Sequence, residues 1–415
     1  MARVHIVGAG LAGLSAAVEL AEGGDVLVHE AAPQAGGRCR SYFDAALGMT
    51  IDNGNHLLLS GNDGALAYAK KIGGDSKLAG PDEAAFDFCD LERRERWRLR
   101  PNAGKLPWWI LSPDRRVPHT AGLDYAALVT LLFARRDQTL RPFLGSGDLA
   151  RKLWDPIFVS ALNTDPSEAS AFLAAAVVRE TFARGGEACR PLVAVEGLSA
   201  AFVDPALDFL RARGAEVRFG AKLRTILFAD DRATALDFGD ETIGLGPDDR
   251  AILAVPPQVA ASLLPGLKAP LEFRAIVNAH FAFPAPKGLP LLTGVIGADS
   301  EWLFGFADRL SVTISAAERF LSTPREDLAR AIWGEVQAVA GVDAPLPAWQ
   351  IIKEKRATFA ATPEQDALRP VARTPWRNLA LAGDWTQTGL PATIEGAIRS
   401  GVTAARLSAG FEQNG

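Results

Sequence analysis

The stretch that decides the fold of this chain is Val4-His-Ile-Val-Gly8-Ala-Gly10-Leu-Ala-Gly13, in which three closely spaced glycines follow a short apolar run. Apolar residues then recur at helical spacing as far as Gly23-Gly24, and a second apolar run, Asp25–Glu30, ends on an acidic residue. This order predicts a strand, a helix and a second strand. Because such a unit closes with a right-handed crossover, it predicts an α/β fold with a parallel sheet.

The same glycines predict a dinucleotide site. Gly8 permits a tight turn, Gly10 lets the backbone approach a pyrophosphate, and Gly13 lets the helix pack closely against the strand. The free N–H groups at the start of the helix, around Ala12, favour phosphate. Glu30 ends the second strand, where a carboxylate accepts hydrogen bonds from a ribose. The glycine pattern alone does not distinguish NAD from FAD.

Composition excludes several classes of protein. The chain has 415 residues, a formal charge of −5, 48% hydrophobic residues and 22% charged residues. It is therefore expected to be a folded protein of two to three domains, without the basic surface that nucleic acid requires. No apolar stretch approaches the roughly 18 residues of a spanning helix. Three widely spaced cysteines argue against a disulfide framework or a zinc cluster, and Arg3–Val7 does not resemble a signal peptide, so a cytoplasmic location is expected.

The chain is expected to cross several times between two interleaved domains. A Rossmann-like nucleotide-binding domain is expected from residues 1–75, 195–265 and 375–415. An α+β substrate-binding domain is expected from residues 76–194 and 266–374. Residues from about 75 to 190 are expected to be largely helical.

A second motif, Gly36-Gly37-Arg38, follows Glu30 closely. The two glycines allow close approach of the backbone to a ligand, and the guanidinium of Arg38 can form paired hydrogen bonds with phosphate oxygens. The segment resembles the flavin-containing amine oxidase and phytoene desaturase superfamily. In that superfamily a Gly-Gly-Arg lies against the FAD pyrophosphate, which implies that Gly37 and Arg38 bind FAD.

The C-terminal region contains Leu381-Ala-Gly-Asp-Trp-Thr-Gln-Thr-Gly-Leu-Pro-Ala-Thr-Ile-Glu395, which resembles the closing motif of the same superfamily. The resemblance implies that Gly383 and Asp384 reach the ribityl chain, and that a final helix points at the isoalloxazine ring. A helix N-terminus in that place stabilises negative charge on a reduced flavin. The cofactor contacts implied for this helix and for two other segments are Ala392, Thr393, Ile394, Asn53, Gly54 and Leu223. FAD is the predicted cofactor.

Three further segments resemble one particular family within this superfamily. They are Asp52-Asn-Gly-Asn-His-Leu-Leu-Leu-Ser-Gly-Asn62, Trp154-Asp-Pro-Ile-Phe-Val-Ser-Ala-Leu-Asn163 and Glu354-Lys-Arg-Ala-Thr-Phe359. They are similar to the squalene-associated FAD-dependent desaturases, the hydroxysqualene dehydroxylases of hopanoid synthesis, and the similarity covers essentially the whole chain. It implies an amine-oxidase-like fold and reductive loss of an allylic hydroxyl from hydroxysqualene, supplied by squalene-synthase-like enzymes. Hydride would come from N5 of reduced FAD, with NAD(P)H as a candidate external reductant that visits the flavin transiently.

Loss of hydroxide needs a positioned acid. His56 is the first candidate, because it follows an Asp-Asn-Gly turn that lies near the flavin in the superfamily. A histidine that only bonds a loop backbone is an equal alternative. Asp155, Asn163 and His280 are second-rank candidates, each with a structural alternative.

A C30 isoprenoid substrate needs a long apolar lining. The side chains expected to supply it are Trp154, Phe158, Asn163, Trp302, Phe304 and Phe306, for which ordinary packing is the alternative reading. The segment 122–136 has an apolar body that ends in two arginines, which suits either a helix resting on the inner face of the cytoplasmic membrane or a buried helix.

Two other functions are compatible with the sequence. A flavin desaturase or an amine oxidase would keep the fold and cofactor but remove hydride from its substrate. A non-redox carrier of prenyl chains would use a related fold but would have no reason to keep Glu30, Gly37-Arg38 and Gly383-Asp384.

Overall fold

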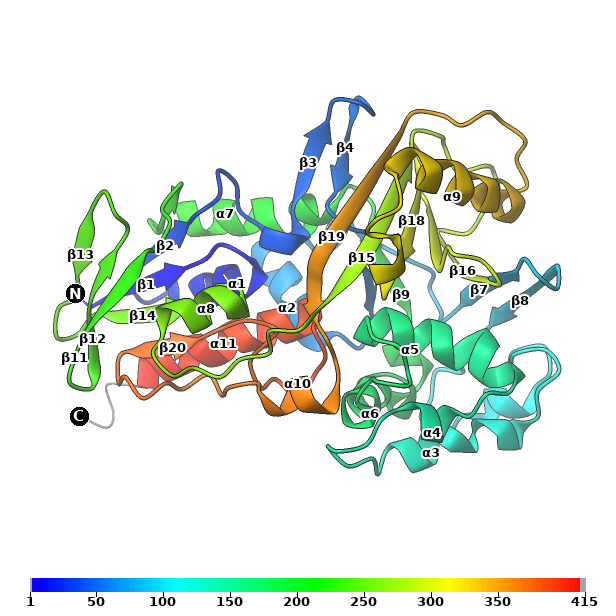
Figure 1. The fold of residues 1–415 in the computed structure, drawn as a ribbon, viewed down its shortest axis with the longest axis horizontal. Helices are drawn as coiled ribbons and strands as arrows, with labels where there is room; N and C mark the ends of the chain where they lie inside the picture. The colour runs from blue at the N-terminus through cyan, green and yellow to red at the C-terminus, as the bar shows by residue number, and fades with distance from the viewer. Residues whose placement is uncertain (1, 411–415) are drawn as a thin grey trace.

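The computed structural model describes residues 2–410, which form two parts along the long axis of the molecule (Figure 1). The first part contains a five-stranded parallel sheet with the order β10-β2-β1-β14-β20. Its strands are β1 Arg3–Val7, β2 Asp25–Glu30, β10 Glu216–Phe219, β14 Arg250–Leu253 and β20 Leu379–Leu381. The central strands are almost continuous apolar runs because both faces of the sheet are covered. The predicted α/β fold with a Rossmann-like start is confirmed.

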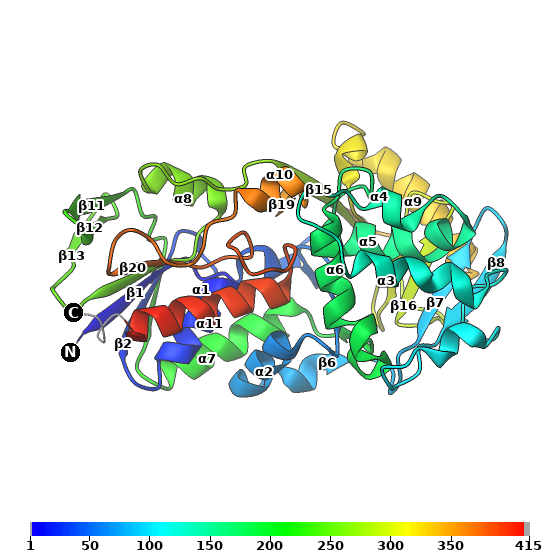
Figure 2. The same ribbon diagram turned by 90° about the horizontal axis from the view of Figure 1, so that it is seen from below.

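Helices cover one face of this sheet and a small antiparallel sheet covers the other (Figure 2). Ile6 and Ile252 pack towards the helices, whereas Val7 and Leu253 pack towards the small sheet. The helices are α1 Leu11–Leu20, α2 Asp63–Ile72, α7 Asp204–Arg211 and α11 Ile394–Gly410. The opposite layer consists of β11 Thr225–Ala229, β12 Arg232–Asp237, β13 Thr242–Gly244 and α8 Pro257–Leu263.

The second part is built on a seven-stranded mixed sheet with the order β19-β15-β18-β17-β16-β7-β8. The strands are β7 Phe86–Asp90, β8 Glu95–Leu99, β15 Phe273–Phe281, β16 Leu292–Ile296, β17 Trp302–Gly305, β18 Leu310–Ile314 and β19 Trp349–Phe359. Helix α9 (Arg325–Ala340) covers one face, where Trp333 packs on Phe281 with ring centroids 5.1 Å apart. The long strands β15 and β19 run from this sheet back towards the parallel sheet (Figure 1).

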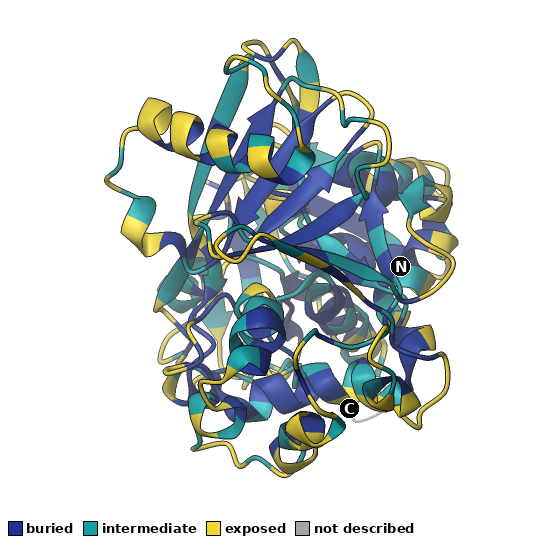
Figure 3. Cartoon of the chain, turned by 90° about the vertical axis from the view of Figure 1, so that its right-hand side faces the viewer, coloured by how far each residue is buried: buried dark blue, intermediate teal, exposed yellow. Residues whose placement is uncertain are grey.

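A group of short helices lies against the other face of the seven-stranded sheet. They are α3 Ala127–Leu131, α4 Arg141–Leu144, α5 Asp155–Leu162 and α6 Ala171–Glu180. Seen from this end, the strands are buried between exposed loops and helix surfaces (Figure 3). The remaining elements are β3 Ser41–Asp44, β4 Met49–Asp52, β5 Leu57–Leu59, β6 Leu78–Ala79, β9 Pro191–Ala194 and α10 Pro363–Ala367.

The expectation that residues from about 75 to 190 are largely helical is wrong at β7 and β8. In β8, the buried Trp97 and Leu99 alternate with the exposed Arg96 and Arg98, which is the period-2 pattern of a strand with one buried face. The two strands pair with each other, and β7 joins the sheet through β16. All strands of the parallel sheet come from residues 1–75, 195–265 and 375–415, while the limits of the two domains stay a prediction.

Two π-helical turns precede Asp-Pro pairs. Residues Ala150–Trp154 lead into Asp155-Pro156, and residues Ser199–Val203 lead into Asp204-Pro205. Proline lacks the N–H that would bond the carbonyl four residues earlier, and its ring collides with that carbonyl. A wider turn before the proline relieves this conflict, and it directs the side chain of Trp154 into the interior, where it is 1% exposed.

Candidate active site

The glycine turn of residues 8–13 has the geometry that the sequence predicts. Gly8 has φ +108°, and a Cβ there would lie 2.3 Å from the carbonyl oxygen of Ala254. A Cβ on Gly13 would lie 1.8 Å from the carbonyl oxygen of Gly8, so the helix packs directly on the turn. A Cβ on Gly10, in contrast, would meet no atom within 4 Å. The turn is therefore closed on the protein side and open at Gly10, as a backbone cradle for a pyrophosphate must be.

Glu30 lies at the edge of this turn. Its two carboxylate oxygens accept hydrogen bonds from the N–H groups of Ala9 (2.7 Å) and Ala32 (2.8 Å). These bonds hold the carboxylate in place and leave lone pairs for ribose hydroxyls. The N–H of Ala221 donates to the carbonyl of Glu30 at 2.9 Å, which brings the segment leading to the buried Leu223 alongside.

The Gly36-Gly37 pair lies against the glycine turn. Gly36 forms a bridge with Gly10 and donates its N–H to the carbonyl of Ala9 at 2.8 Å. Both glycines have positive φ, +103° and +56°, which other residues rarely adopt. The pair thus gives the cradle at Gly10 a second wall without side chains.

Arg38 joins the two ends of the chain. Its Nη2 donates to both carboxylate oxygens of Asp384 at 2.7 Å, and its Nη1 donates to the carbonyl of Ala357 at 2.6 Å. The pairing with Asp384 spans 346 positions of sequence and was not anticipated, because Arg38 was expected to bond phosphate. The side chain is still 44% exposed, so one flank of Arg38 remains available to a ligand.

The C-terminal motif packs directly on the N-terminal unit, as required for one shared site. Strand β20 follows β14 in the parallel sheet, and α11 lies against α1, where Ser15 Oγ donates to the carbonyl of Ile398. The N–H of Gly383 donates to Ser400 Oγ at 2.8 Å, which ties the start of the motif to α11. Thr393 Oγ1 accepts the N–H of Gly396 at 3.0 Å and caps the first turn, so Ala392, Thr393 and Ile394 form the N-terminal end of α11.

The loop after Gly383 is held by a residue that the sequence did not reveal. The guanidinium of Arg369 is 0% exposed and donates to the carbonyls of Asp384 (3.0 Å) and Thr386 (2.5 Å) and to Thr388 Oγ1 (2.8 Å). It also pairs with Asp366 at 3.0 Å. Its Nε also donates to the carbonyl of Thr386 at 2.9 Å, so four hydrogen bonds from one guanidinium fix the loop that carries Asp384. An isolated arginine in a polar loop has no sequence signal for this role.

A polar network connects the loop of residues 52–56 with the seven-stranded sheet. Asn55 Nδ2 donates to Thr313 Oγ1 at 3.2 Å, and Thr313 Oγ1 donates to Asn278 Oδ1 at 2.8 Å. Asn278 also crowds Gly54, where a Cβ would lie 2.9 Å from Asn278 Nδ2. Asn53 Nδ2 donates to Glu354 Oε2 at 3.3 Å, which ties the same loop to β19.

Asn55 is a second residue of this region that no sequence pattern singles out. Its Oδ1 atom is buried and has no hydrogen-bond partner among the described residues. Buried acceptors are almost always paired, so this oxygen, in the same loop as His56, is free to accept a hydrogen bond from a ligand or a water.

His56 and His280 are both neutral near pH 7. Burial and the positive charge of Arg38 lower the pKa of His56 to about 4. Burial, with a contribution from Arg309, lowers the pKa of His280 to about 3, and His280 Nδ1 lies 2.8 Å from Ser311 Oγ. His56 can therefore serve as a neutral N–H donor to a leaving oxygen, but not as a charged imidazolium.

The other two second-rank acid candidates have structural partners. Asp155 pairs with Arg141 at 2.9 Å in the first turn of α5. Asn163 ends α5 with φ +48° and uses both ends of its amide, accepting the N–H of Ala316 at 2.7 Å and donating to Thr358 Oγ1 at 3.0 Å. Both arrangements favour the structural alternatives, and no observation places either residue at the reacting atoms.

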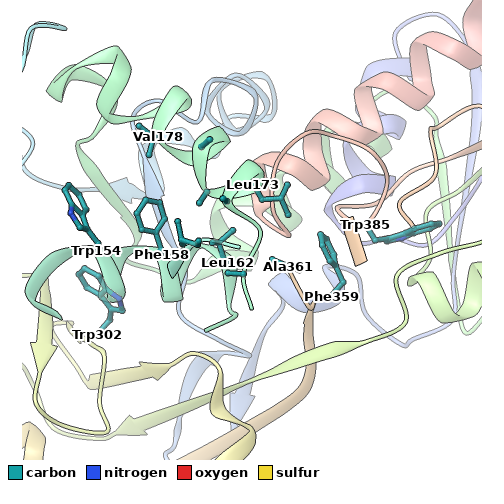
Figure 4. Packing of buried hydrophobic residues seen from close by; sticks show 14 of the residues in the cluster. Trp154, Phe158, Leu162, Leu173, Val178, Trp302, Phe359, Ala361 and Trp385 are labelled. Atoms are coloured by element: carbon teal, nitrogen blue, oxygen red, sulfur yellow. The ribbon is translucent and has the colours of Figure 1, made fainter. Parts of the chain in front are cut away.

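The aromatic residues expected to line the substrate path lie in one buried cluster. Trp154 and Phe158 pack with ring centroids 6.3 Å apart, and Phe304 and Phe306 stack at 6.2 Å. Trp302 donates its indole N–H to Ser160 Oγ. The cluster continues through Leu162 and Phe359 to Trp385, beside Gly383 (Figure 4). An apolar interior therefore extends from the helical group to the C-terminal motif.

The cradle at Gly10, the carboxylate of Glu30, the Arg38–Asp384 pair and the capped end of α11 fit FAD. Together with the fold they define a flavin-dependent oxidoreductase.

Comparison with known proteins agrees that this is a flavin-dependent oxidoreductase and shows the family to which it belongs. The profile of the "Flavin containing amine oxidoreductase" family matches residues 11–407. The chain is 58% identical to hydroxysqualene dehydroxylase of Rhodopseudomonas palustris over 97% of both chains, and 54% identical to that of Sinorhizobium fredii over 98% of both. An oxidoreductase structure from Methanosarcina mazei superimposes with a TM-score of 0.72 at 14% identity, covering 97% of this chain and 100% of the other. The chain belongs to the hydroxysqualene dehydroxylase family within the flavin-containing amine oxidoreductases, and its cofactor is FAD.

Proposed function

We propose that this protein reductively removes the allylic hydroxyl of hydroxysqualene and releases squalene. The observation that carries the proposal is the continuity between the flavin-binding elements and a buried aromatic cluster, which suits a long uncharged isoprenoid. The relatives that share about half or more of its residues are named for this activity.

Reduced FAD supplies a hydride for the allylic carbon that loses its oxygen. We assign the side chains of the 52–56 loop to the departing hydroxyl. The neutral imidazole of His56 donates a hydrogen bond to the oxygen as the C–O bond breaks, which lowers the barrier to loss of hydroxide. The unpaired Asn55 Oδ1 accepts a hydrogen bond from the hydroxyl O–H and so orients the group. The aromatic cluster excludes water, which would otherwise capture the developing allylic cation.

The product formed from hydroxysqualene tests the function. Purified protein loaded with FAD and reduced anaerobically should convert hydroxysqualene to squalene, with one flavin oxidised for each squalene formed. Oxidised protein should leave hydroxysqualene unchanged. Unchanged hydroxysqualene with reduced enzyme would overturn the proposal, and a product with an additional double bond from oxidised enzyme would identify a desaturase instead.

The substrate also indicates where the enzyme works. Hydroxysqualene partitions into a bilayer, and we place the enzyme at the inner face of the cytoplasmic membrane, next to squalene-synthase-like enzymes that supply hydroxysqualene. Among residues 2–410, every helix is too short or too polar to cross a bilayer, so the association we propose is peripheral. NAD(P)H is our proposed external reductant.

A further inference from the structure

Exposed apolar side chains gather on one segment of the chain. Six of the twelve exposed large hydrophobic residues of the described chain fall between residues 106 and 133. They are Leu106 (81% exposed), Trp108 (52%), Leu111 (72%), Leu123 (87%), Val129 (61%) and Phe133 (81%), and we call them the 106–133 surface. An exposed apolar group of this kind marks an interaction site in a folded protein.

The two halves of this surface form one face. The turn Trp108–Leu111 packs on the turn Gly122–Ala126, where a Cβ on Gly122 would lie 3.2 Å from Leu111 Cδ2. Beneath them, the buried Trp109 and Tyr125 meet edge to face with ring centroids 5.1 Å apart. These anchors hold the outward side chains on short rigid turns at the end of the molecule far from both termini, beside α3 (Figures 1 and 2).

The charge around the surface is opposite to that of the chain. Residues 105–136 contain five basic and two acidic side chains, a formal charge of +3, whereas the whole chain carries −5. The guanidinium of Arg115 lies 4.8 Å over the Trp108 ring, and Arg135, 72% exposed, pairs only with its neighbour Asp137 among the described residues. Such a local excess of positive charge beside apolar side chains matches an anionic lipid surface.

The surface is also connected to the interior. Tyr125 contacts Trp154 at 5.7 Å between ring centroids, and Trp154 contacts Phe158 at 6.3 Å. These rings belong to the buried cluster that reaches Phe359 and Trp385 (Figure 4). A lipid substrate leaving a bilayer at this surface would therefore lie next to the predominantly apolar cluster that extends to the flavin motifs.

We propose that the 106–133 surface docks on an anionic lipid bilayer and admits the substrate from it. The docking rests on exposure and charge alone, whereas the admission of substrate rests also on the proposed function. The sequence pointed to residues 122–136 as a single helix. The structure divides this segment into the turn Gly122–Ala126 and the short helix α3, and adds residues 106–111 to the same face.

Vesicle flotation tests the docking without substrate. The FAD-loaded full chain should float with vesicles of phosphatidylglycerol and phosphatidylcholine. The double variant Leu123→Ser, Phe133→Ser should lose about tenfold or more of the binding, because two apolar side chains leave the bilayer. The matched control Phe43→Ser, Leu227→Ser removes exposed residues of the same types elsewhere (67% and 48% exposed) and should bind as the unmodified protein does.

A second pair of variants tests how much positive charge contributes to vesicle binding. Arg135→Glu should weaken binding to anionic vesicles by about fivefold or more, whereas Arg211→Glu, which removes an equally exposed arginine from α7, should not. Unmodified protein that stays off vesicles, or equal binding by the Leu123→Ser, Phe133→Ser variant, would overturn the proposal. A concentration-dependent dimer that this double variant abolishes would overturn it in favour of a second copy of the chain.

Activity separates this inference from the proposed function. With hydroxysqualene dispersed in detergent, the Leu123→Ser, Phe133→Ser variant should match the unmodified rate. With hydroxysqualene embedded in vesicles, its rate should fall in parallel with its binding. If the unmodified enzyme makes no squalene in either form, the proposed function fails, and flotation still decides the docking.

Discussion

At the scale of single residues, the glycine turn shows most directly how side-chain volume controls the site. Gly10 and Gly13 lie only three positions apart in the chain. A Cβ on Gly10 would nevertheless point into open space, whereas a Cβ on Gly13 would collide with the Gly8 carbonyl. The backbone of Gly10 is extended, with φ −75° and ψ 176°, which alanine also adopts.

This contrast predicts opposite outcomes for two equivalent substitutions. Gly10→Ala should leave the melting temperature of the flavin-free protein unchanged and weaken FAD binding about tenfold or more, because the methyl group occupies the pyrophosphate cradle. Gly13→Ala should destabilise the flavin-free protein itself by about 1–3 kcal/mol. Thermal unfolding of both proteins and FAD titration measure the two effects. A loss of stability in Gly10→Ala equal to that in Gly13→Ala would contradict this reading.

His56 provides the second test at this scale. His56→Phe should lower kcat about 10²-fold or more while the flavin absorbance of the purified protein is retained. Because the pKa of His56 is lowered to about 4, the imidazole is uncharged throughout the neutral range. The rate of the unmodified enzyme should therefore show no inflection near the ordinary histidine pKa of about 6.5. An inflection there that disappears in His56→Phe would show that the charged form is the acid.

At the scale of elements, the loop after β20 depends on its contacts with Arg369. Strand β14 holds the edge strand β20 itself, but residues 384–388 have few backbone partners apart from turns. Arg369 supplies the missing donors from the chain that precedes β20.

Arg369→Met should therefore destabilise the protein by about 3–5 kcal/mol, because it leaves buried acceptors and the Asp366 carboxylate without this donor. It should also reduce the flavin content, because the loop carries Asp384. The control is Arg136→Met, which removes the other partner of Asp366 (3.2 Å) from a position 56% exposed and should cost about 1 kcal/mol or less. Urea unfolding and flavin absorbance give both quantities. Equal losses of unfolding free energy in the two variants would show that the burial of Arg369 does not increase its contribution to stability.

At the scale of the whole molecule, stability should respond to pH through Glu301. Burial raises the pKa of this carboxyl, at the start of β17, to about 7, against the opposing hydrogen bond from the N–H of Ser315 at 2.7 Å. The native state therefore holds a proton between about pH 4.5 and 7 that the unfolded state has released, so this group lowers the free energy of unfolding as pH rises through that range.

Glu301→Gln keeps the shape and the acceptor of the protonated acid. It should stabilise the protein by about 2 kcal/mol at pH 8 and have little effect at pH 4.5. Free energies of unfolding of both proteins at the two pH values test this expectation. The same stabilisation at both values would mean that packing rather than ionisation is responsible.

Whether the sequence predicts a contact depends on how far apart the two contacting residues lie along the chain. The β1-α1-β2 unit was predictable because strand, glycine turn, helix and acid are contiguous, so local periodicity and turn chemistry already specify them. The strands β7 and β8 were missed, because an alternation of only five residues around Trp97 is a weak signal between helical segments.

The amino-acid sequence by itself determined the nucleotide fold, the cofactor and the family, because these depend on short motifs whose residues act on their immediate neighbours. Only the tertiary structure decided that Arg38 pairs with Asp384, that Asn55 joins Thr313, and that Arg369 holds the flavin loop. It also brought Leu111 beside Gly122 and so made one surface of two segments. These contacts join residues that are distant in the chain, and their partners are chosen by how the two sheets pack, which no local pattern encodes.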